Sequence, residues 1–199
     1  MLTNWTKFKV KISLIKFKVK IIIKNTLYGY NTRFYIDSHT NVEKDVFWRL
    51  GPNSNLSIDL NTHVGNFCRF ECSENANISI GKNVQFTGNN FVACMDSIEI
   101  GDNTLIGEFV SIRDNDHEYI DVNNNIDSQG YNTSSIKISD DVWIGRGSVI
   151  LKGVSIGKHC VIGANSVVNK NVDSYSVAVG APAKVIKIYN FKTQKWEKI

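Results

Sequence analysis

The chain has 199 residues, of which 42% are hydrophobic and 21% are charged. This size and balance allow one domain with a sizeable core, and they exclude a wholly disordered chain, a collagen and a small disulfide scaffold. The formal net charge is +4, but residues 1–24 hold seven lysines and no acid, so the rest of the chain is slightly acidic. We therefore expect no nucleic-acid partner.

Residues 1–54 read as a basic N-terminal arm and a lead-in to the rest of the chain. Lysines alternate strictly with apolar residues over 7–12 and over 16–21, and this period of two favours strands. A helix is the alternative, and it would have apolar residues on two opposite faces. Those faces would be Trp5, Phe8, Ile12, Ile15, Val19 and Ile22 on one side and Val10, Leu14, Phe17 and Ile21 on the other.

The arm lacks the features of a secretory signal, and its longest uninterrupted apolar run, Ile21–Ile23, is too short to span a membrane. We therefore expect a cytoplasmic protein. Each lysine gains about 1 kcal/mol near an anionic lipid surface, so weak peripheral contact with the inner face of the membrane is one expectation for the arm. A solvated basic edge that packs on the body or on a partner subunit is the alternative.

Four cysteines lie within patterns of apolar or small residues, and they form no C-x-x-C pair. No histidine stands at metal-ligand spacing from them. The sequence therefore predicts buried, reduced thiols and no metal site. The residues are Cys68, Cys72, Cys94 and Cys160.

The strongest pattern in the chain is an aliphatic period of six residues. It runs without a break through Ile138, Ile144, Ile150, Ile156, Ile162 and Val168, and the same phase occurs at Ile100, Ile106 and Ile112. A period of six is neither helical nor a simple alternation. It predicts short strands joined by tight corners, where Gly or Asn adopts left-handed backbone angles. Three such sides close a triangular coil, and stacked coils bury a continuous aliphatic column.

We therefore predict an all-β chain in which residues 55–187 form a parallel β-helix of the hexapeptide-repeat type, with a β-sandwich as the alternative. A loop at 113–135 interrupts the repeat, and residues 188–199 read as a capping hairpin or short helix. The spacing from Ile80 to Ile100 exceeds one coil by two residues, which predicts a bulge or a loosened corner near residues 87–90.

The run from Asp141 to Val172, continued by Val179-Gly-Ala-Pro-Ala-Lys-Val-Ile-Lys187, resembles the C-terminal half of the hexapeptide-repeat acetyltransferases. It is most similar to the maltose and galactoside acetyltransferases and to the O-acetyltransferases of surface polysaccharides. The resemblance covers about residues 55–187. It implies left-handed coiling, against the usual crossover rule, and a homotrimer that binds acetyl-CoA between neighbouring subunits without a metal.

The loop at 113–135 contains the residue that the resemblance implies to be catalytic, His117. Long polar loops within a regular solenoid are often functional. Acyl transfer to a hydroxyl needs a base that is neutral near pH 7, and free imidazole, with a pKa of about 6.5, suits that task. Asp116 and Asp114 are candidates to orient the imidazole. The alternative for His117 is a solvated surface histidine.

The resemblance also implies contacts for the two substrates. Trp143 would stand near the pantetheine arm of acetyl-CoA, and Gly145, Gly163 and Ala164 would let the cofactor approach the backbone. Basic side chains would meet the CoA end, namely Arg146, Lys170, Lys184 and Lys187. Asn89 and Asn90 fall where related enzymes present an amide to the acceptor.

These features predict an acetyl-CoA-dependent O-acetyltransferase that acts on a sugar hydroxyl in surface-polysaccharide biosynthesis. An N-acetyltransferase of an amino sugar or nucleotide sugar is an alternative, since the same histidine would serve. A zinc lyase of the gamma carbonic anhydrase type needs three histidines, and only His117 lies in the right zone. The remaining alternative is a non-catalytic β-helix for binding or scaffolding.

Overall fold

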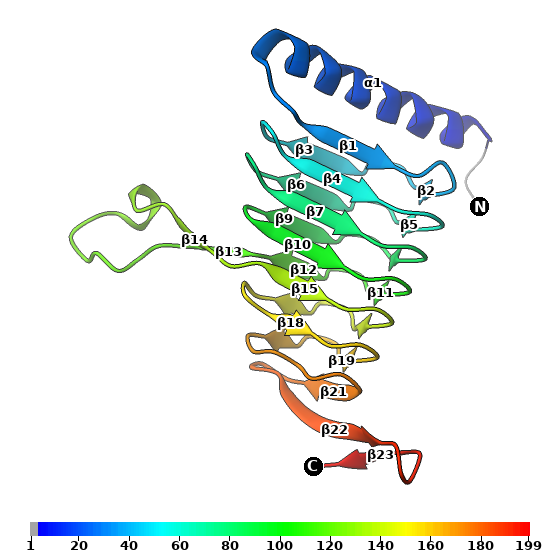
Figure 1. Ribbon diagram of the computed structural model, residues 1–199, viewed down its shortest axis with the longest axis vertical. Coiled ribbons are helices and arrows are strands. Elements are labelled where there is room, and N and C mark those ends of the chain that lie inside the picture. The colour runs from blue at the N-terminus through cyan, green and yellow to red at the C-terminus, as the bar shows by residue number, and fades with distance from the viewer. Residues whose placement is uncertain (1–3) are drawn as a thin grey trace.

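A computed structural model describes residues 4–199 and shows a stack of triangular coils capped by a helix at one end and a hairpin at the other (Figure 1). Three parallel sheets form the faces of the prism, and each coil contributes one strand to each face. In Figure 1, strands of the front face run to the right and the chain returns behind them as it descends, so the coil is left-handed. The predicted fold class is confirmed.

Face A is the sheet that lies in front in Figure 1. Its strands are β1 (Arg33–Ile36), β4 (Asn55–Ile58), β7 (Asn77–Ile80), β10 (Ser97–Ile100), β15 (Ile136–Ile138) and β18 (Ser155–Ile156). Face C consists of β3 (Phe47–Leu50), β6 (Arg69–Cys72), β9 (Phe91–Cys94), β12 (Ser111–Arg113), β17 (Val149–Ile150) and β20 (Val167–Val168). The stack therefore starts at Arg33, upstream of the predicted boundary at residue 55.

Face B is the longest sheet, because the C-terminal hairpin extends it. Its parallel strands are β2 (Asn41–Val42), β5 (His63–Val64), β8 (Gln85–Phe86), β11 (Leu105–Ile106), β16 (Trp143–Ile144), β19 (Val161–Ile162) and β21 (Ser176–Val179). The antiparallel hairpin of β22 (Lys184–Asn190) and β23 (Lys195–Lys198) then covers the open edge of β21. Exposed strand edges need such cover.

The coils shorten along the chain, which the period of six does not predict. Asn55 lies beside Asn77, 22 residues on, whereas Ser148 lies beside Ser166, 18 residues on. On faces A and C, the strands of the longer coils have four residues and point two side chains inward, whereas the strands of face B keep two residues. The prediction of a bulge near residues 87–90 is wrong, because the spacing of six holds from Ile80 through Phe86 to Val92. The two extra residues lie between Val92 and Ile100, where β9 and β10 each have four residues.

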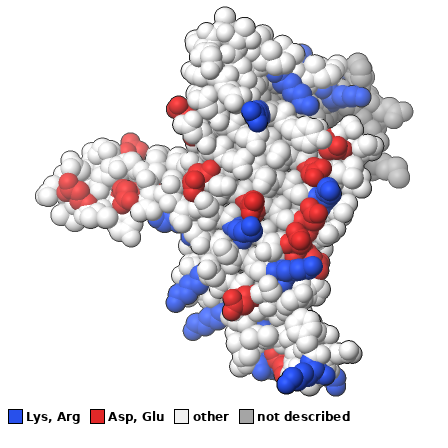
Figure 2. Space-filling view, viewed as in Figure 1, with Lys and Arg blue, Asp and Glu red and all other residues white. Residues whose placement is uncertain are grey.

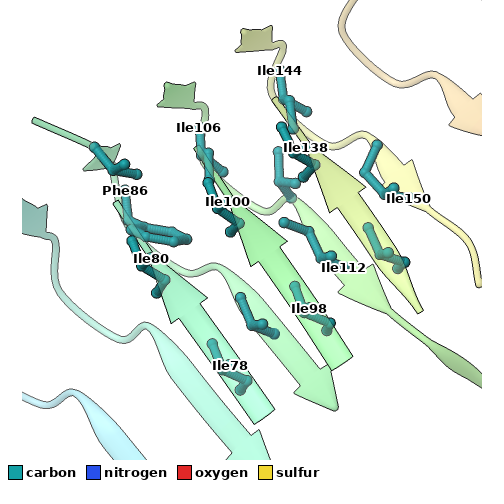
Figure 3. Packing of buried hydrophobic residues seen from close by; sticks show 14 of the residues in the cluster. Ile78, Ile80, Phe86, Ile98, Ile100, Ile106, Ile112, Ile138, Ile144 and Ile150 are labelled. Carbon is teal, nitrogen blue, oxygen red and sulfur yellow. The ribbon is translucent and has the colours of Figure 1, made fainter. Parts of the chain in front are cut away.

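The inward positions stack into one aliphatic column (Figure 3). Ile78, Ile98 and Ile144 have no exposed surface, and burying such a side chain contributes about 1.5–3 kcal/mol. Asparagines occupy many corners with left-handed backbone angles, as Asn83 (φ 56°) and Asn165 (φ 57°) illustrate. Asn tolerates these angles better than other residues with a Cβ, so each corner costs little.

The N-terminal arm forms a helix, α1 (Asn4–Tyr28), so the prediction of strands is wrong. Val10, Leu14, Phe17 and Ile21 recur at helical spacing and turn toward the first coil, where Phe17 packs edge-on against Phe34 at 5.0 Å between ring centroids. The helix thus buries an apolar face over the open end of the solenoid. Lysine at every second position is compatible with a strand as well as with this helix. The helix is favoured because its apolar face covers the open end of the solenoid.

Candidate active site

The loop at 113–135 leaves the solenoid at the edge between faces C and A, between β12 and β15. It forms an antiparallel ribbon of β13 (Asn115–His117) and β14 (Tyr131–Thr133), with a short 3-10 helix, η1 (Ile126–Ser128), near its far end. The ribbon projects well away from the prism (Figure 1). The side chains near the base of the ribbon, such as that of the buried Asp114, lie against the coils.

Asp114 anchors the base of this ribbon. Its side chain is fully buried, and its carboxylate accepts hydrogen bonds from the backbone N–H groups of Met95 and Asp96, both at 2.8 Å. The Cys94 thiol donates to the same carboxylate at 3.2 Å. Asp114 therefore provides the acceptor for the backbone N–H groups at the corner between β9 and β10. This structural role differs from the predicted one, in which Asp114 would orient the imidazole of His117.

His117 is exposed and lies opposite Tyr131 in the ribbon. Their ring centroids are 4.5 Å apart, with an angle of 38° between the planes. Asp116 points to the other face of the ribbon, since successive residues of a strand alternate, and its carboxylate lies 3.8 Å from the Lys152 ammonium. Lys152 also donates to Asn132 at 2.6 Å. Within residues 9–199, no hydrogen bond joins His117 to either predicted acid.

A groove of about 310 Å³ opens beside His117 along face C. Its floor carries a stacked pair, in which the Arg113 guanidinium lies 4.5 Å from the centroid of the Phe91 ring. Arg69, one coil away, lies 5.3 Å from the centroid of the same ring and is paired with Glu71. The full lining is Glu71, Ser73, Phe91, Ala93, Cys94, Met95, Arg113, Asn115, Asp116, His117 and Tyr131.

Most of the predicted CoA contacts lie elsewhere, on face B and on the edge between faces B and C. Trp143 on β16 has 55% of its surface exposed. Arg146 follows β16 at that edge, 5.4 Å from the Phe109 ring, and the exposed Ala164 follows β19 at the same edge. Lys184 and Lys187 lie on β22, which extends face B.

Lys170 does not join this group. It follows β20 and therefore lies at the edge between faces C and A, where Lys152 follows β17 one coil earlier. The three lysines predicted to meet one CoA end thus occupy two different parts of the prism. The spacing in the sequence does not reveal this separation of the lysines. The chain turns by about a third of a full turn from one side of a coil to the next, so residues that are close in sequence can lie on different faces.

Gly145 and Gly163 are required by the stacking of the coils. A Cβ on Gly145 would lie 2.6 Å from the Ala164 backbone nitrogen, and one on Gly163 would lie 2.6 Å from Cγ1 of Val179. Real Cβ atoms avoid contacts this short, so any side chain here would push neighbouring coils apart. The packing accounts for both glycines without reference to a cofactor.

Asn90 also has a role within the fold. Its side chain is 2% exposed, its amide donates to the Gly107 carbonyl at 2.6 Å, and its oxygen accepts from the Gly88 N–H at 3.2 Å. These bonds hold a corner together, so Asn90 is not available as the predicted contact to the acceptor. Asn89 occupies the left-handed position of the same corner (φ 55°) and has an exposed side chain.

The cysteines are buried and free, as predicted. Burial raises the pKa of the Cys68 thiol to about 11. The hydrogen bond with Cys72, burial and the Asp114 carboxylate all raise the pKa of Cys94. In the part of the chain that the structure describes, no three His, Cys, Asp or Glu side chains are grouped as metal ligands would be.

The predicted base and the predicted CoA contacts lie on different parts of the prism. His117 and its groove lie at face C and the edge between C and A, whereas Trp143, Arg146 and Ala164 lie at face B and the edge between B and C. One chain therefore does not bring the predicted base and the predicted CoA surface together. Sequence analysis missed Tyr131, which lies in the ribbon beside His117, and Lys152, which contacts Asn132 and Asp116 on the other face of the ribbon. Only a correct pairing of β13 with β14 would have identified them.

Comparisons with known proteins agree with the repeat. Residues 135–170 match the family model of the bacterial transferase hexapeptide (six repeats). The putative lipopolysaccharide biosynthesis O-acetyl transferase WbbJ of Escherichia coli (strain K12) is 37% identical over 123 residues, which are 58% of this chain and 63% of that protein. The chain spans less than two thirds of the length of the first curated relatives that it matches.

Two solved structures extend the comparison. A mutant of AntD, an N-acyltransferase from Bacillus cereus in complex with dTDP-4-amino-4,6-dideoxyglucose and Coenzyme A, superposes with a TM-score of 0.67 at 20% identity, over 80% of this chain and 86% of that one. The hexapeptide-repeat acetyltransferase VCA0836 from Vibrio cholerae O1 biovar eltor, complexed with acetyl-CoA, gives 0.52 at 27% identity, over 76% and 72%. The chain therefore contains a matched hexapeptide repeat that folds as a β-helix, and it is similar to proteins that are named as acyltransferases.

Proposed function

We propose that this protein is an acetyl-CoA-dependent O-acetyltransferase with a sugar acceptor and with His117 as its general base. The observation that carries the proposal is the position of His117, which the β13–β14 ribbon holds at the mouth of a groove on face C. The similarity to the putative lipopolysaccharide O-acetyl transferase supports a role in surface-polysaccharide biosynthesis. The acetyl-CoA complex of VCA0836 supports the acyl donor.

The chemistry requires one direct transfer. His117 accepts the proton of the acceptor hydroxyl while the hydroxyl oxygen attacks the thioester carbonyl carbon. An ester C–O bond forms, the C–S bond breaks, and the imidazolium returns the proton to the CoA thiolate. Exposure of His117 suits a base that must meet two substrates.

The groove beside His117 suits a sugar. Arg113, whose guanidinium lies over the Phe91 ring, lines the groove and has N–H donors that can bind sugar hydroxyls. Asn115 also lines the groove. Its amide nitrogen donates to the Ala93 carbonyl and to the Asp114 carboxylate, so its side-chain oxygen is the group that can accept from a sugar hydroxyl. Hydroxyl recognition of this kind gives specificity, because an acceptor without the right hydroxyls leaves these groups unpaired.

The active site is proposed to form between subunits of a homotrimer. The candidate CoA contacts Trp143, Arg146, Ala164 and Lys184 lie on a different part of the prism from His117, so a second copy would complete the site. The projecting loop carries apolar side chains that are strongly exposed in one chain, such as Ile120 (81%) and Val122 (92%). A neighbouring subunit would cover them.

The sharing of sites can be tested by mixing variants. His117→Ala and Trp143→Ala subunits are each expected to form weakly active homotrimers. When they are unfolded and refolded together, some sites would pair an intact His117 with an intact Trp143 from the neighbour, so activity should recover. No recovery in mixed trimers of verified composition would contradict a shared site.

The activity is tested with labelled acetyl-CoA and a panel of sugars and nucleotide sugars. Transfer of label to a hydroxyl is expected, and the product should release its acetyl group with hydroxylamine, which cleaves esters and spares amides. A product stable to hydroxylamine would instead establish N-acetylation. A scaffold protein would give no transfer and no stabilisation by acetyl-CoA, whereas a ligand at about 100 times its Kd adds about 2.7 kcal/mol.

A further inference from the structure

The capping helix α1 has an apolar face that the solenoid does not cover. Its inner side chains pack on the first coil, with Ile21 buried. On the outer side, Ile15, Val19, Ile22 and Ile23 have between 47% and 62% of their surface exposed. At about 100° per residue these four fall within one stripe, roughly opposite the inner face. Exposed apolar stripes of this kind mark contact surfaces.

Lysines border this stripe on both sides. Lys11 and Lys18 follow one flank, and Lys16 and Lys20 follow the other. The helix contains no acidic residue. In the part of the chain whose side chains are described, none of these four lysines takes part in an ion pair. Basic side chains project from the α1 end of the molecule in Figure 2, whereas both signs of charge alternate over the strands.

The charge pattern selects among the partners that could cover the stripe. A second copy of α1 would bring lysines against lysines, which is unfavourable. An anionic lipid surface offers negative charge to both flanks and an apolar layer to the stripe between them, which is how interfacial amphipathic helices bind. No helix within the described residues is long and apolar enough to cross a bilayer. The helix would therefore lie in the plane of the surface.

We propose that α1 is a two-sided helix whose inner face closes the β-helix and whose outer face docks the protein on an anionic membrane surface. The outer face points away from the coils at the end of the prism, so docking needs no rearrangement of the fold (Figure 1). The proposal does not depend on the enzymatic activity. Each flanking lysine should raise the partition onto anionic lipid by about five-fold.

Co-sedimentation with vesicles tests this proposal on the full chain. The vesicles are phosphatidylcholine alone, or phosphatidylcholine with about one third phosphatidylglycerol, in about 0.05 M and about 0.5 M NaCl. We expect the protein to pellet with the phosphatidylglycerol vesicles at low salt, and to remain largely in the supernatant at high salt and with phosphatidylcholine alone. Absence of pelleting with phosphatidylglycerol at low salt would overturn the proposal.

Two variants separate the apolar and the charged contributions. Val19→Asp with Ile23→Asp should lower the partition coefficient by about ten-fold or more, and Lys16→Gln with Lys20→Gln should lower it about 25-fold. The matched control is Phe67→Asp with Ile199→Asp, which replaces two exposed apolar residues (57% and 74% exposed) outside both α1 and the projecting loop. Control protein should pellet like wild type. Equal losses in the control and the α1 variant would contradict the proposal.

Two further readouts guard the interpretation. Unchanged thermal melting shows that the α1 variants keep the helix docked, because their substitutions leave the inner face intact. Light scattering without lipid gives the oligomeric state. If Val19→Asp with Ile23→Asp lowers the oligomer mass, the outer face is an interface between copies of the chain and the membrane proposal is wrong.

Discussion

The Tyr131 ring lies 4.5 Å from the His117 imidazole because the two residues face each other across the β13–β14 ribbon. Directly paired residues of an antiparallel ribbon project to the same side, so the pairing itself fixes the contact. The arrangement gives an exposed histidine a defined position without any hydrogen bond to Asp114 or Asp116. Tyr131 is thus a candidate positioning residue for the proposed base.

Substitution of Tyr131 tests this role. Aromatic contacts contribute about 0.5–1.5 kcal/mol, so Tyr131→Ala should lower kcat by up to about ten-fold once an acceptor is known. Tyr131→Phe keeps the ring and should retain most of kcat. Steady-state kinetics on both variants separate kcat from KM. Wild-type kcat in Tyr131→Ala would exclude the positioning role, and equal losses in both variants would assign the effect to the hydroxyl instead.

Asp114 should matter for stability rather than for proton transfer. Asp114→Asn replaces one carboxylate oxygen with an amide NH₂ that cannot accept from Met95 or Asp96, which leaves a partly buried backbone N–H without its partner. Such a loss costs about 1–3 kcal/mol or more, because the lost acceptor is charged. Urea unfolding should show it as a lower midpoint with an unchanged slope. Asp116→Asn, at the exposed surface of the ribbon, is the control and should unfold like wild type.

Gly145 gives a prediction that separates packing from cofactor access. Gly145→Ala puts a Cβ 2.6 Å from the Ala164 nitrogen, and overpacking of this kind costs about 1–3 kcal/mol. The melting temperature should therefore fall in the absence of acetyl-CoA. A variant with wild-type stability that binds acetyl-CoA poorly would show instead that the glycine serves the cofactor.

The buried cysteines should resist modification. Because burial holds the pKa of Cys68 at about 11, far above neutral pH, almost none of this thiol is present as reactive thiolate. Native protein near neutral pH should react with a disulfide reagent only as fast as it opens. Unfolded protein should yield all four thiols at once. Fast native reaction of Cys68 would contradict its burial.

The regular part of the fold could be predicted from the sequence because one aliphatic residue per side fills the column. Ile138, Ile144 and Ile150 report the coil directly, since each marks a new side at a fixed spacing. The longer coils are harder to recognise. Strands such as β10 point two side chains inward, and the spacing between repeats then departs from six.

The arm and the site show where sequence patterns are insufficient. In α1, the same lysines satisfy a period of two and a helical face, and only the uncovered first coil decides between them. In the site, Asp114 and Asp116 look alike in sequence, but one turns into the core and the other toward Lys152. Asn90 turns inward at its corner to bond neighbouring backbone groups, much as Asp114 does. A single sequence also cannot show which edge a second copy would cover.

The activity of His117→Ala measures the central claim most directly. The histidine is exposed and its ring contacts Tyr131 alone among the described aromatic pairs, so the variant should melt like wild type and keep its oligomeric state. With acetyl-CoA and an identified acceptor, its kcat should fall by about 10² to 10⁴, the usual contribution of a general base. A folded His117→Ala protein that transfers acetyl groups at the wild-type rate would contradict the proposed mechanism.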